Sequence, residues 1–142
     1  MATRADFSAE QWQVLGFAVE DTMMLVAVSN GTHFFESFAE IGASARFLAE
    51  QAKTSRSTLV RDLASGIGMK RDRDLGADPV QFERHVLSRI AEAVAIVDSV
   101  SPEELDAIKE FLLGVADSAA EARNGIDEQE ANAIEKIKSA ML

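Results

Sequence analysis

Apolar residues recur every three or four positions along most of this chain, which is the spacing of an amphipathic helix. No segment shows the alternation of apolar and polar residues that a half-buried strand requires. The pattern predicts helices over about 8–29, 33–53, 57–65, 79–99, 102–123 and 127–140. The sequence therefore predicts an all-α fold, a single-domain bundle of about six helices.

Capping residues mark where the first predicted helix begins. Ser8 and Gln11 can each satisfy the other's backbone N–H in a capping box, and Phe7 and Trp12 stand at the two positions of a hydrophobic staple. Further along, residues 23–28 are all apolar. A helix that is apolar on every side must be covered on most of them, so we expect this first helix to be central.

A second start signal is Ser101-Pro102-Glu103-Glu104, which places a proline at the first helical position. Here too the spacing predicts a capping box, with the Glu104 side chain returning to the backbone of Ser101. This helix and the first have nearly equal predicted lengths.

Both of these helices lead into the dipeptide Asn-Gly, at Asn30-Gly31 and at Asn124-Gly125, and each glycine is followed five residues later by a glutamate. A β-hairpin turn is excluded because the flanking residues have helical spacing. An EF-hand loop is excluded because, at its ligand positions, only the asparagines could bind a cation. The remaining interpretation is a helix C-cap, since Asn and Gly adopt the left-handed conformation at low cost.

The repeated order of capped helix, Asn-Gly and following helix predicts an imperfect duplication. Its halves span about 7–53 and 101–142, and each contributes a helix pair. Between them, a stretch at about 66–77 contains three glycines and the run Lys70 to Asp74, and it is predicted to be a loop with many basic residues. We treat the whole of 1–142 as one domain, since this length suits a single core.

Composition and charge exclude some classes of function. The formal net charge is −10, although residues 46–89 carry nine bases against six acids. An acidic chain argues against nucleic acid as a partner, because phosphate binding needs clustered lysine and arginine. Cysteine is absent, which excludes a cysteine-ligated zinc site. The longest apolar run, residues 23–28, is far too short to cross a bilayer and no signal peptide is apparent, so we expect a soluble, cytoplasmic protein.

Three stretches together resemble the tellurite-resistance TerB-like family: the Trp12 helix with its Val/Ala-rich run into Asn30-Gly31, the segment Ala107 to Leu113, and the segment Asn124 to Glu130. The resemblance covers roughly residues 7–41 and 79–142. It implies a two-repeat all-helical domain without a reaction of its own, associated with stress-response and membrane-linked systems.

In that family the turn between paired helices typically reads Ala-Asp-Gly followed by glutamate, and its acidic residues are suspected metal ligands. This chain carries Asn30 and Asn124 where the aspartates would stand, which removes a formal charge from each turn. Carboxylates beside turn carbonyls favour a hard cation such as Ca²⁺ or Mg²⁺. The candidate metal ligands that the resemblance implies are Asp127 and Glu130 in the second repeat, and Glu36 and Glu40 in the first.

Three other carboxylates are candidates for chemistry. Asp21 has apolar helical neighbours, so it is either a buried acid with a raised pKa or, as we favour, part of a helix edge where it and Glu20 face water. Asp117 and Glu121 lie one turn apart and either share a cation or, again favoured, lie on a solvated face. The two histidines, His33 and His85, show no zinc-site spacing and favour solvated or packing roles.

The leading hypothesis is a non-enzymatic interaction or sensing domain of the TerB-like kind, with divalent-cation binding and a protein partner or self-association as further expectations. The alternatives are a small carboxylate and metal-dependent helical enzyme, and a carrier of apolar ligands with a methionine- and phenylalanine-rich interior around Met23, Met24 and Phe34. An enzyme needs acids converging in one pocket, and a carrier needs an apolar cavity.

Overall fold

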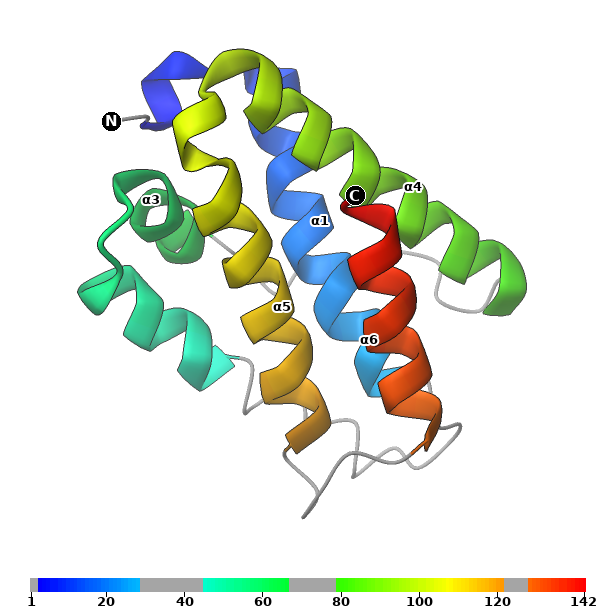
Figure 1. Cartoon of the computed structure of the whole chain (residues 1–142). Coiled ribbons are helices and arrows are strands. Elements are labelled where there is room, and N and C mark those ends of the chain that lie inside the picture. Colours follow the sequence, from blue (N-terminus) through cyan, green and yellow to red (C-terminus); the bar gives the residue numbers. More distant parts are fainter. Residues whose placement is uncertain (1–2, 29–44, 67–78, 122–127) are drawn as a thin grey trace.

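The protein is an all-α bundle, as its computed structural model describes it for residues 3–28, 45–66, 79–121 and 128–142. Within these residues there is no strand, which confirms the predicted fold class (Figure 1). The elements are η1 (Arg4–Asp6), α1 (Ala9–Val28), a helix over 45–54, α3 (Thr58–Gly66), α4 (Pro79–Val100), η2 (Pro102–Glu104), α5 (Leu105–Glu121) and α6 (Glu128–Ala140).

α1 is the central helix and contacts α4, α5 and α6, as predicted from its apolar second half (Figure 1). Along it Leu15, Val19, Met23 and Val26 are each at most 1% exposed. These four side chains share one stripe, and Asp21 and Leu25, at 2% and 4% exposed, extend the buried surface to another side of α1, because helices cover it on several sides. The four helices α1, α4, α5 and α6 are called the four-helix core below.

The start of α1 confirms the predicted capping box and staple. The Ser8 N–H donates to Gln11 Oε1 at 2.9 Å, and the Gln11 N–H donates to Ser8 Oγ at 3.1 Å. The rings of Phe7 and Trp12 lie 5.9 Å apart, centroid to centroid. Two of the N–H groups that a helix start leaves unpaired are thereby satisfied.

The capping box predicted at Ser101 is wrong. Residues 102–104 form a 3-10 helix, in which the Glu104 N–H donates to the backbone carbonyl of Ser101 at 2.9 Å, so the serine hydroxyl is not needed there. That hydroxyl donates instead to Glu103 Oε1 at 2.6 Å. The Glu104 side chain is consequently available for another partner, which comes from a distant part of the chain.

The helix over 45–54 and α3 form a helical hairpin against one side of the core, and residues 45–66 are called the outer hairpin below. The Phe47 ring stacks on Phe111 of α5, with centroids 6.2 Å apart, and lies directly over Gly114. A side chain at position 114 would occupy the space that the ring fills, so glycine there permits the close approach. Leu59, Val60 and Leu63 bury the inner face of α3.

α1 and α5 run in the same direction and α6 runs in the opposite one, so Val28, Glu121 and Glu128 lie at the same end of the bundle (Figure 1). Of the predicted loop over 66–77, Gly66 ends α3 and residues 67–77 lie outside the described residues. Residues 33–44 of the second predicted helix and both Asn-Gly pairs also lie outside them. The proposed duplication stays a prediction. No helix in the described part of the chain has the length and apolarity to cross a membrane.

Candidate functional site

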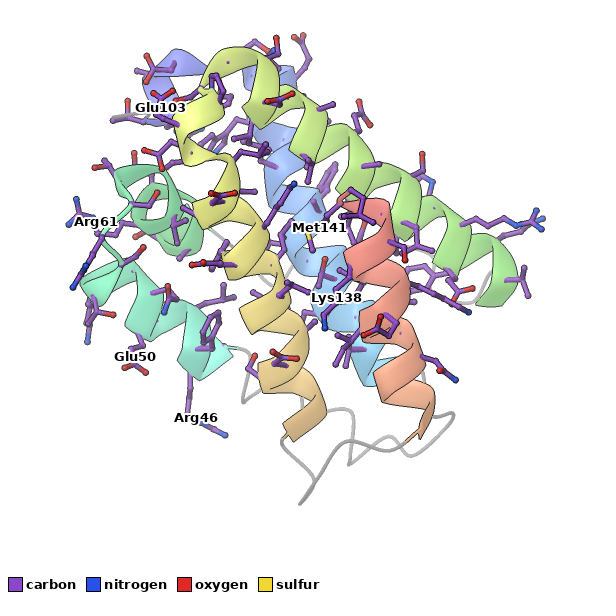
Figure 2. All side chains as sticks on the ribbon, in the orientation of Figure 1. Arg46, Glu50, Arg61, Glu103, Lys138 and Met141 are labelled. Carbon is purple, nitrogen blue, oxygen red and sulfur yellow. The ribbon has the colours of Figure 1, made fainter. Side chains whose placement is uncertain are left out.

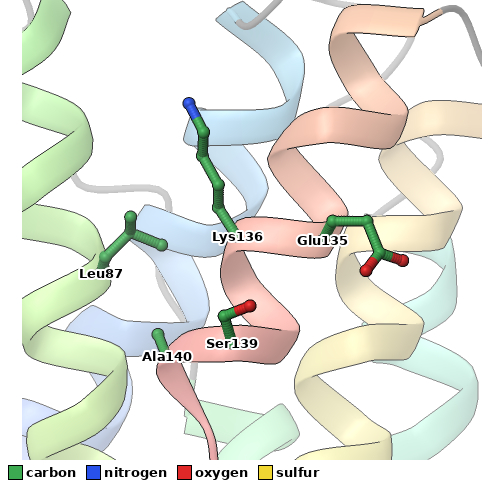
Figure 3. Close-up of a pocket in the computed structure, with 5 residues that line it drawn as sticks. All are labelled: Leu87, Glu135, Lys136, Ser139 and Ala140. Carbon is green, nitrogen blue, oxygen red and sulfur yellow. The ribbon is translucent and has the colours of Figure 1, made fainter.

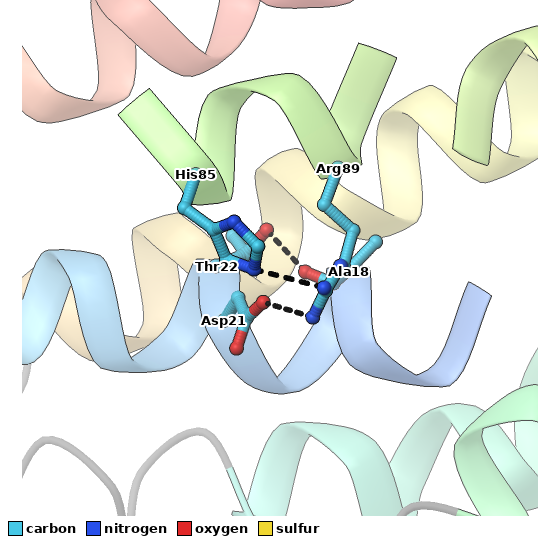
Figure 4. Close-up of polar contacts among 5 residues, drawn as sticks. All are labelled: Ala18, Asp21, Thr22, His85 and Arg89. Atoms are coloured by element: carbon cyan, nitrogen blue, oxygen red, sulfur yellow. Dashed lines mark hydrogen bonds and ion pairs between the residues drawn. The ribbon is translucent and has the colours of Figure 1, made fainter. Parts of the chain in front are cut away.

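A polar cluster lies between α1 and α4 and contains one of the predicted candidates, the buried Asp21 (Figure 4). Its side chain is 3% exposed, and its Oδ2 accepts a charged hydrogen bond from Nη1 of Arg89 on α4 at 3.2 Å (Figure 4). The same guanidinium group lies over the Phe17 ring, with Cζ 5.0 Å from the ring centroid. Arg89 therefore crosses from α4 to α1 and holds both a carboxylate and an aromatic face.

The other end of this guanidinium contacts His85, one helical turn earlier on α4. Arg89 Nη2 lies 2.8 Å from His85 Nε2 (Figure 4). In this contact the guanidinium nitrogen donates and Nε2 accepts, because a guanidinium nitrogen can only donate. His85 is exposed, so the cluster leads from solvent through Arg89 to the buried Asp21.

The favoured expectation that Asp21 faces water is wrong. The residue is 2% exposed, because α4 covers the side of α1 on which it lies. The alternative of a functional acid gains no support either, since the Asp21 carboxylate is engaged by Arg89 across the two helices. The arrangement is that of a buried ion pair joining two helices.

The structure places Asp117 on the exposed side of α5, which agrees with the solvated face that we favoured. The positions of Glu36, Glu40 and Asp127 lie outside the described residues, as do the side chains of Glu121 in α5 and Glu130 in α6. Within the described side chains, no group of three or more acidic or histidine residues could hold a metal ion. The predicted metal ligands are thus untested.

A second polar contact was missed by the sequence analysis and links the outer hairpin to the core. Ser57 Oγ donates to Oε2 of Glu104 at 2.7 Å and accepts the Val60 N–H at 3.1 Å, so one hydroxyl caps α3 and binds a buried carboxylate. The Ser57 position before an apolar run is an N-cap signal, but nothing in the sequence joins it to a residue 47 positions away. Arg89 was missed for the same reason.

A shallow depression lies between α4 and α6 and is lined by Leu87, Glu135, Lys136, Ser139 and Ala140 (Figure 3). On one side Lys136 forms an ion pair with Glu83 of α4, at 2.9 Å. On the other, Lys138 pairs with Glu135 at 3.4 Å. Both lysines are half exposed, and each is already paired with a glutamate. The depression therefore offers a small apolar surface from Leu87 and Ala140, without unpaired lysines or several acids pointing into it.

No protein-family model, curated protein or solved structure was found to match this chain.

Proposed function

We propose that this protein is a non-enzymatic interaction or sensing domain of the TerB-like kind, linked to stress responses, and that it binds a divalent cation such as Ca²⁺ or Mg²⁺. The candidate ligands are Glu36 and Glu40 after the first Asn-Gly pair, and Asp127 and Glu130 after the second. Oxygen ligands of this kind suit a hard cation.

The observation that supports this proposal is the parallel course of α1 and α5. Both helices end at the end of the bundle where α6 begins (Figure 1). The chain leaves α1 two residues before Asn30, leaves α5 three residues before Asn124, and enters α6 directly after Asp127. The two segments that carry the candidate ligands therefore start from one end of the molecule.

The enzyme alternative gains nothing from the described carboxylates. Asp21 is buried against α4 and compensated by Arg89, whereas Asp117 is exposed on α5. These two candidates occupy different environments rather than one acidic pocket. The carrier alternative needs an apolar cavity, whereas Met23 is 1% exposed and packs within the hydrophobic core.

Calorimetric titration of the chelator-treated protein with Ca²⁺, Mg²⁺, Mn²⁺ and Zn²⁺ tests the proposal. We expect weak binding of Ca²⁺ or Mg²⁺ and a rise in melting temperature, since a ligand that binds the folded state stabilises it. The absence of both effects for all four cations would reject the cation-binding part.

Charge-neutralising variants locate the site. Glu36→Gln with Glu40→Gln tests the first set, and Asp127→Asn with Glu130→Gln tests the second. The matched control is Glu110→Gln with Asp117→Asn, which removes the same charge from the exposed side of α5. Loss of binding in the control as well would indicate a general counterion effect instead of a defined site.

A further inference from the structure

The outer hairpin differs in charge from the rest of the described protein. It carries four bases, Arg46, Lys53, Arg56 and Arg61, against the two acids Glu50 and Asp62. In each of the other described segments, 3–28, 79–121 and 128–142, acids outnumber bases. The hairpin is therefore a locally basic surface on an acidic protein.

The basic side chains of the hairpin are available to a partner. Arg46, Lys53 and Arg56 are exposed, and none of them forms an ion pair with a described carboxylate. Figure 2 shows Arg46 and Arg61 extending outward from the hairpin. We call Arg46, Lys53 and Arg56 the basic strip; the exposed Glu50 lies on the same helix face between Arg46 and Lys53, so this face is predominantly rather than purely basic.

The neighbouring helix α5 presents the opposite charge. Asp106, Glu110 and Asp117 are exposed, and their spacing of four and seven residues places them along one side of the helix. We call these three residues the acidic strip. The contact of Phe47 with Phe111 and Gly114 fixes the hairpin beside α5, so the two strips lie on adjacent elements of one molecule.

We propose that this hairpin and α5 surface is a docking site for a second copy of the chain, with the basic strip of each copy against the acidic strip of the other. A two-fold axis between the strips exchanges them, which gives a self-complementary interface and a closed dimer. Charge complementarity supports this occupant, because both halves of the pairing are present on the same chain. A polyanion such as nucleic acid could match the basic strip alone and would be repelled by the net charge of −10.

The physical consequence is a weak, salt-sensitive association. Exposed ion pairs each contribute little, and the overall negative charge of two copies opposes their approach. We expect the dissociation constant to rise about tenfold or more between low and high ionic strength, because salt screens exposed charges. The proposal rests on the interaction-domain part of the proposed function and needs no cation, so its test is made with chelator present.

The experiment is sedimentation velocity of the full chain over a range of protein and salt concentrations, for wild type and two charge-reversal variants. The first variant reverses the basic strip with Arg46→Glu, Lys53→Glu and Arg56→Glu. The second reverses the acidic strip with Asp106→Lys, Glu110→Lys and Asp117→Lys. We expect each variant alone to remain monomeric, while an equimolar mixture forms a heterodimer, since one variant is then acidic on both strips and the other is basic on both.

The matched control is Glu92→Lys with Asp98→Lys, which reverses two exposed charges on α4 and should leave the dimer in place. A wild-type protein that stays monomeric at low salt and high concentration overturns the proposal, and so does a dimer that both strip variants leave intact. Failure of the mixture to associate also overturns it. Cation binding measured separately is unaffected by any of these results, so the two proposals can fail independently.

Discussion

The four-helix core and the outer hairpin hold their helices in different ways. The core helices α1, α4, α5 and α6 have 20, 22, 17 and 13 residues, and each contacts several of the others. α3 has only 9 residues, and isolated helices shorter than about 12–15 residues are marginal in water. The hairpin therefore depends on its contacts with the core, whereas the core helices support one another.

Three specific contacts attach the hairpin to the rest of the protein. The Phe47 ring lies on Gly114 and Phe111, Ser57 binds Glu104, and Asp62 accepts the Arg4 N–H at 3.3 Å. The first contact is apolar, and the other two are single hydrogen bonds. The buried face of α3 also packs against the core. The comparison indicates that the hairpin can separate from the core at a lower free energy than global unfolding requires.

The largest expected difference comes from truncating one buried leucine in each region. Leu15 in α1 and Leu59 in α3 are 1% and 0% exposed. We expect Leu15→Ala to lower the free energy of unfolding by about 3 to 4 kcal/mol, measured by urea denaturation. Leu59→Ala should cost less, about 2 kcal/mol, because its cost cannot exceed the free energy that holds the hairpin on the core.

Hydrogen exchange separates the two cases. In Leu59→Ala, amides of α3 should exchange faster while those of α1 keep their protection. Equal costs for the two variants, with faster exchange throughout the chain, would mean that core and hairpin unfold as one unit.

The next effect tests the polar cluster inside the core. Arg89→Met removes the guanidinium that compensates the buried Asp21, and we expect a loss of about 3 kcal/mol at neutral pH in the same urea assay. Adding Asp21→Leu to this variant should restore most of the loss, since an apolar pair replaces a buried ion pair at little net cost. A double variant as unstable as the single one would indicate that Asp21 has a role beyond this pair.

Two glycines provide a matched test of the hairpin contact. A Cβ at Gly114 would collide with the Phe47 ring, whereas a Cβ at Gly16 in α1 has nothing within 4 Å. We expect Gly114→Ala to lower stability by about 1 to 2 kcal/mol, since overpacking outweighs the gain in helix propensity. Gly16→Ala should raise stability by up to about 1 kcal/mol. Thermal unfolding measures both, and a stabilising Gly114→Ala would mean that the ring moves away freely.

An effect of similar size is expected where one hydroxyl joins the regions. Ser57→Ala removes the cap of α3 and the hydrogen bond to Glu104, and should cost about 1 to 2 kcal/mol. The control is Ser65→Ala, in the same helix, whose exposed hydroxyl bonds only the Arg61 carbonyl at 2.7 Å and should change stability by less than about 0.5 kcal/mol. Similar losses of stability in both variants would mean that the Ser57 hydroxyl does not join the two regions in the way described.

The local features of the fold were predicted well from the sequence, because helix periodicity and capping depend on residues that are close together in the chain. The bounds of α1, α3 and α4 agree with the prediction to within one or two residues, and the capping box at Ser8 is confirmed. The box at Ser101 failed although its residues fit, since a 3-10 turn satisfied the same N–H through a backbone carbonyl.

The candidate site was less predictable because its partners are distant in the chain. Asp21 was recognised as unusual, but its burial depends on Arg89, 68 residues later, and so could not be settled from its own helix. Asp117 was placed correctly because the polar side of a helix is a local property. Glu36, Glu40 and Asp127 lie outside the described residues, and so does the side chain of Glu130. The metal site that the sequence favoured therefore stays a prediction.

The smallest effect concerns the corner between α4 and α5, where Glu104 binds Ser57 of the hairpin and the adjacent Glu103 is exposed and binds Ser101. The hydrogen bond from Ser101 lowers the pKa of Glu103 below its ordinary value of 4.5, with a smaller contribution from the Glu103 backbone N–H. A lowered pKa stabilises the folded state at neutral pH, and this contribution is lost as the pH falls through the folded-state value. Ser101→Ala should therefore shift the pKa of Glu103 upward in an NMR titration of its carboxyl carbon. Ser57→Ala should leave that pKa unchanged, since Ser57 binds Glu104 and belongs to the hairpin contact. A shift of Glu103 in the Ser57 variant would show that the corner transmits hairpin separation into the core, and the two regions would then be coupled through it.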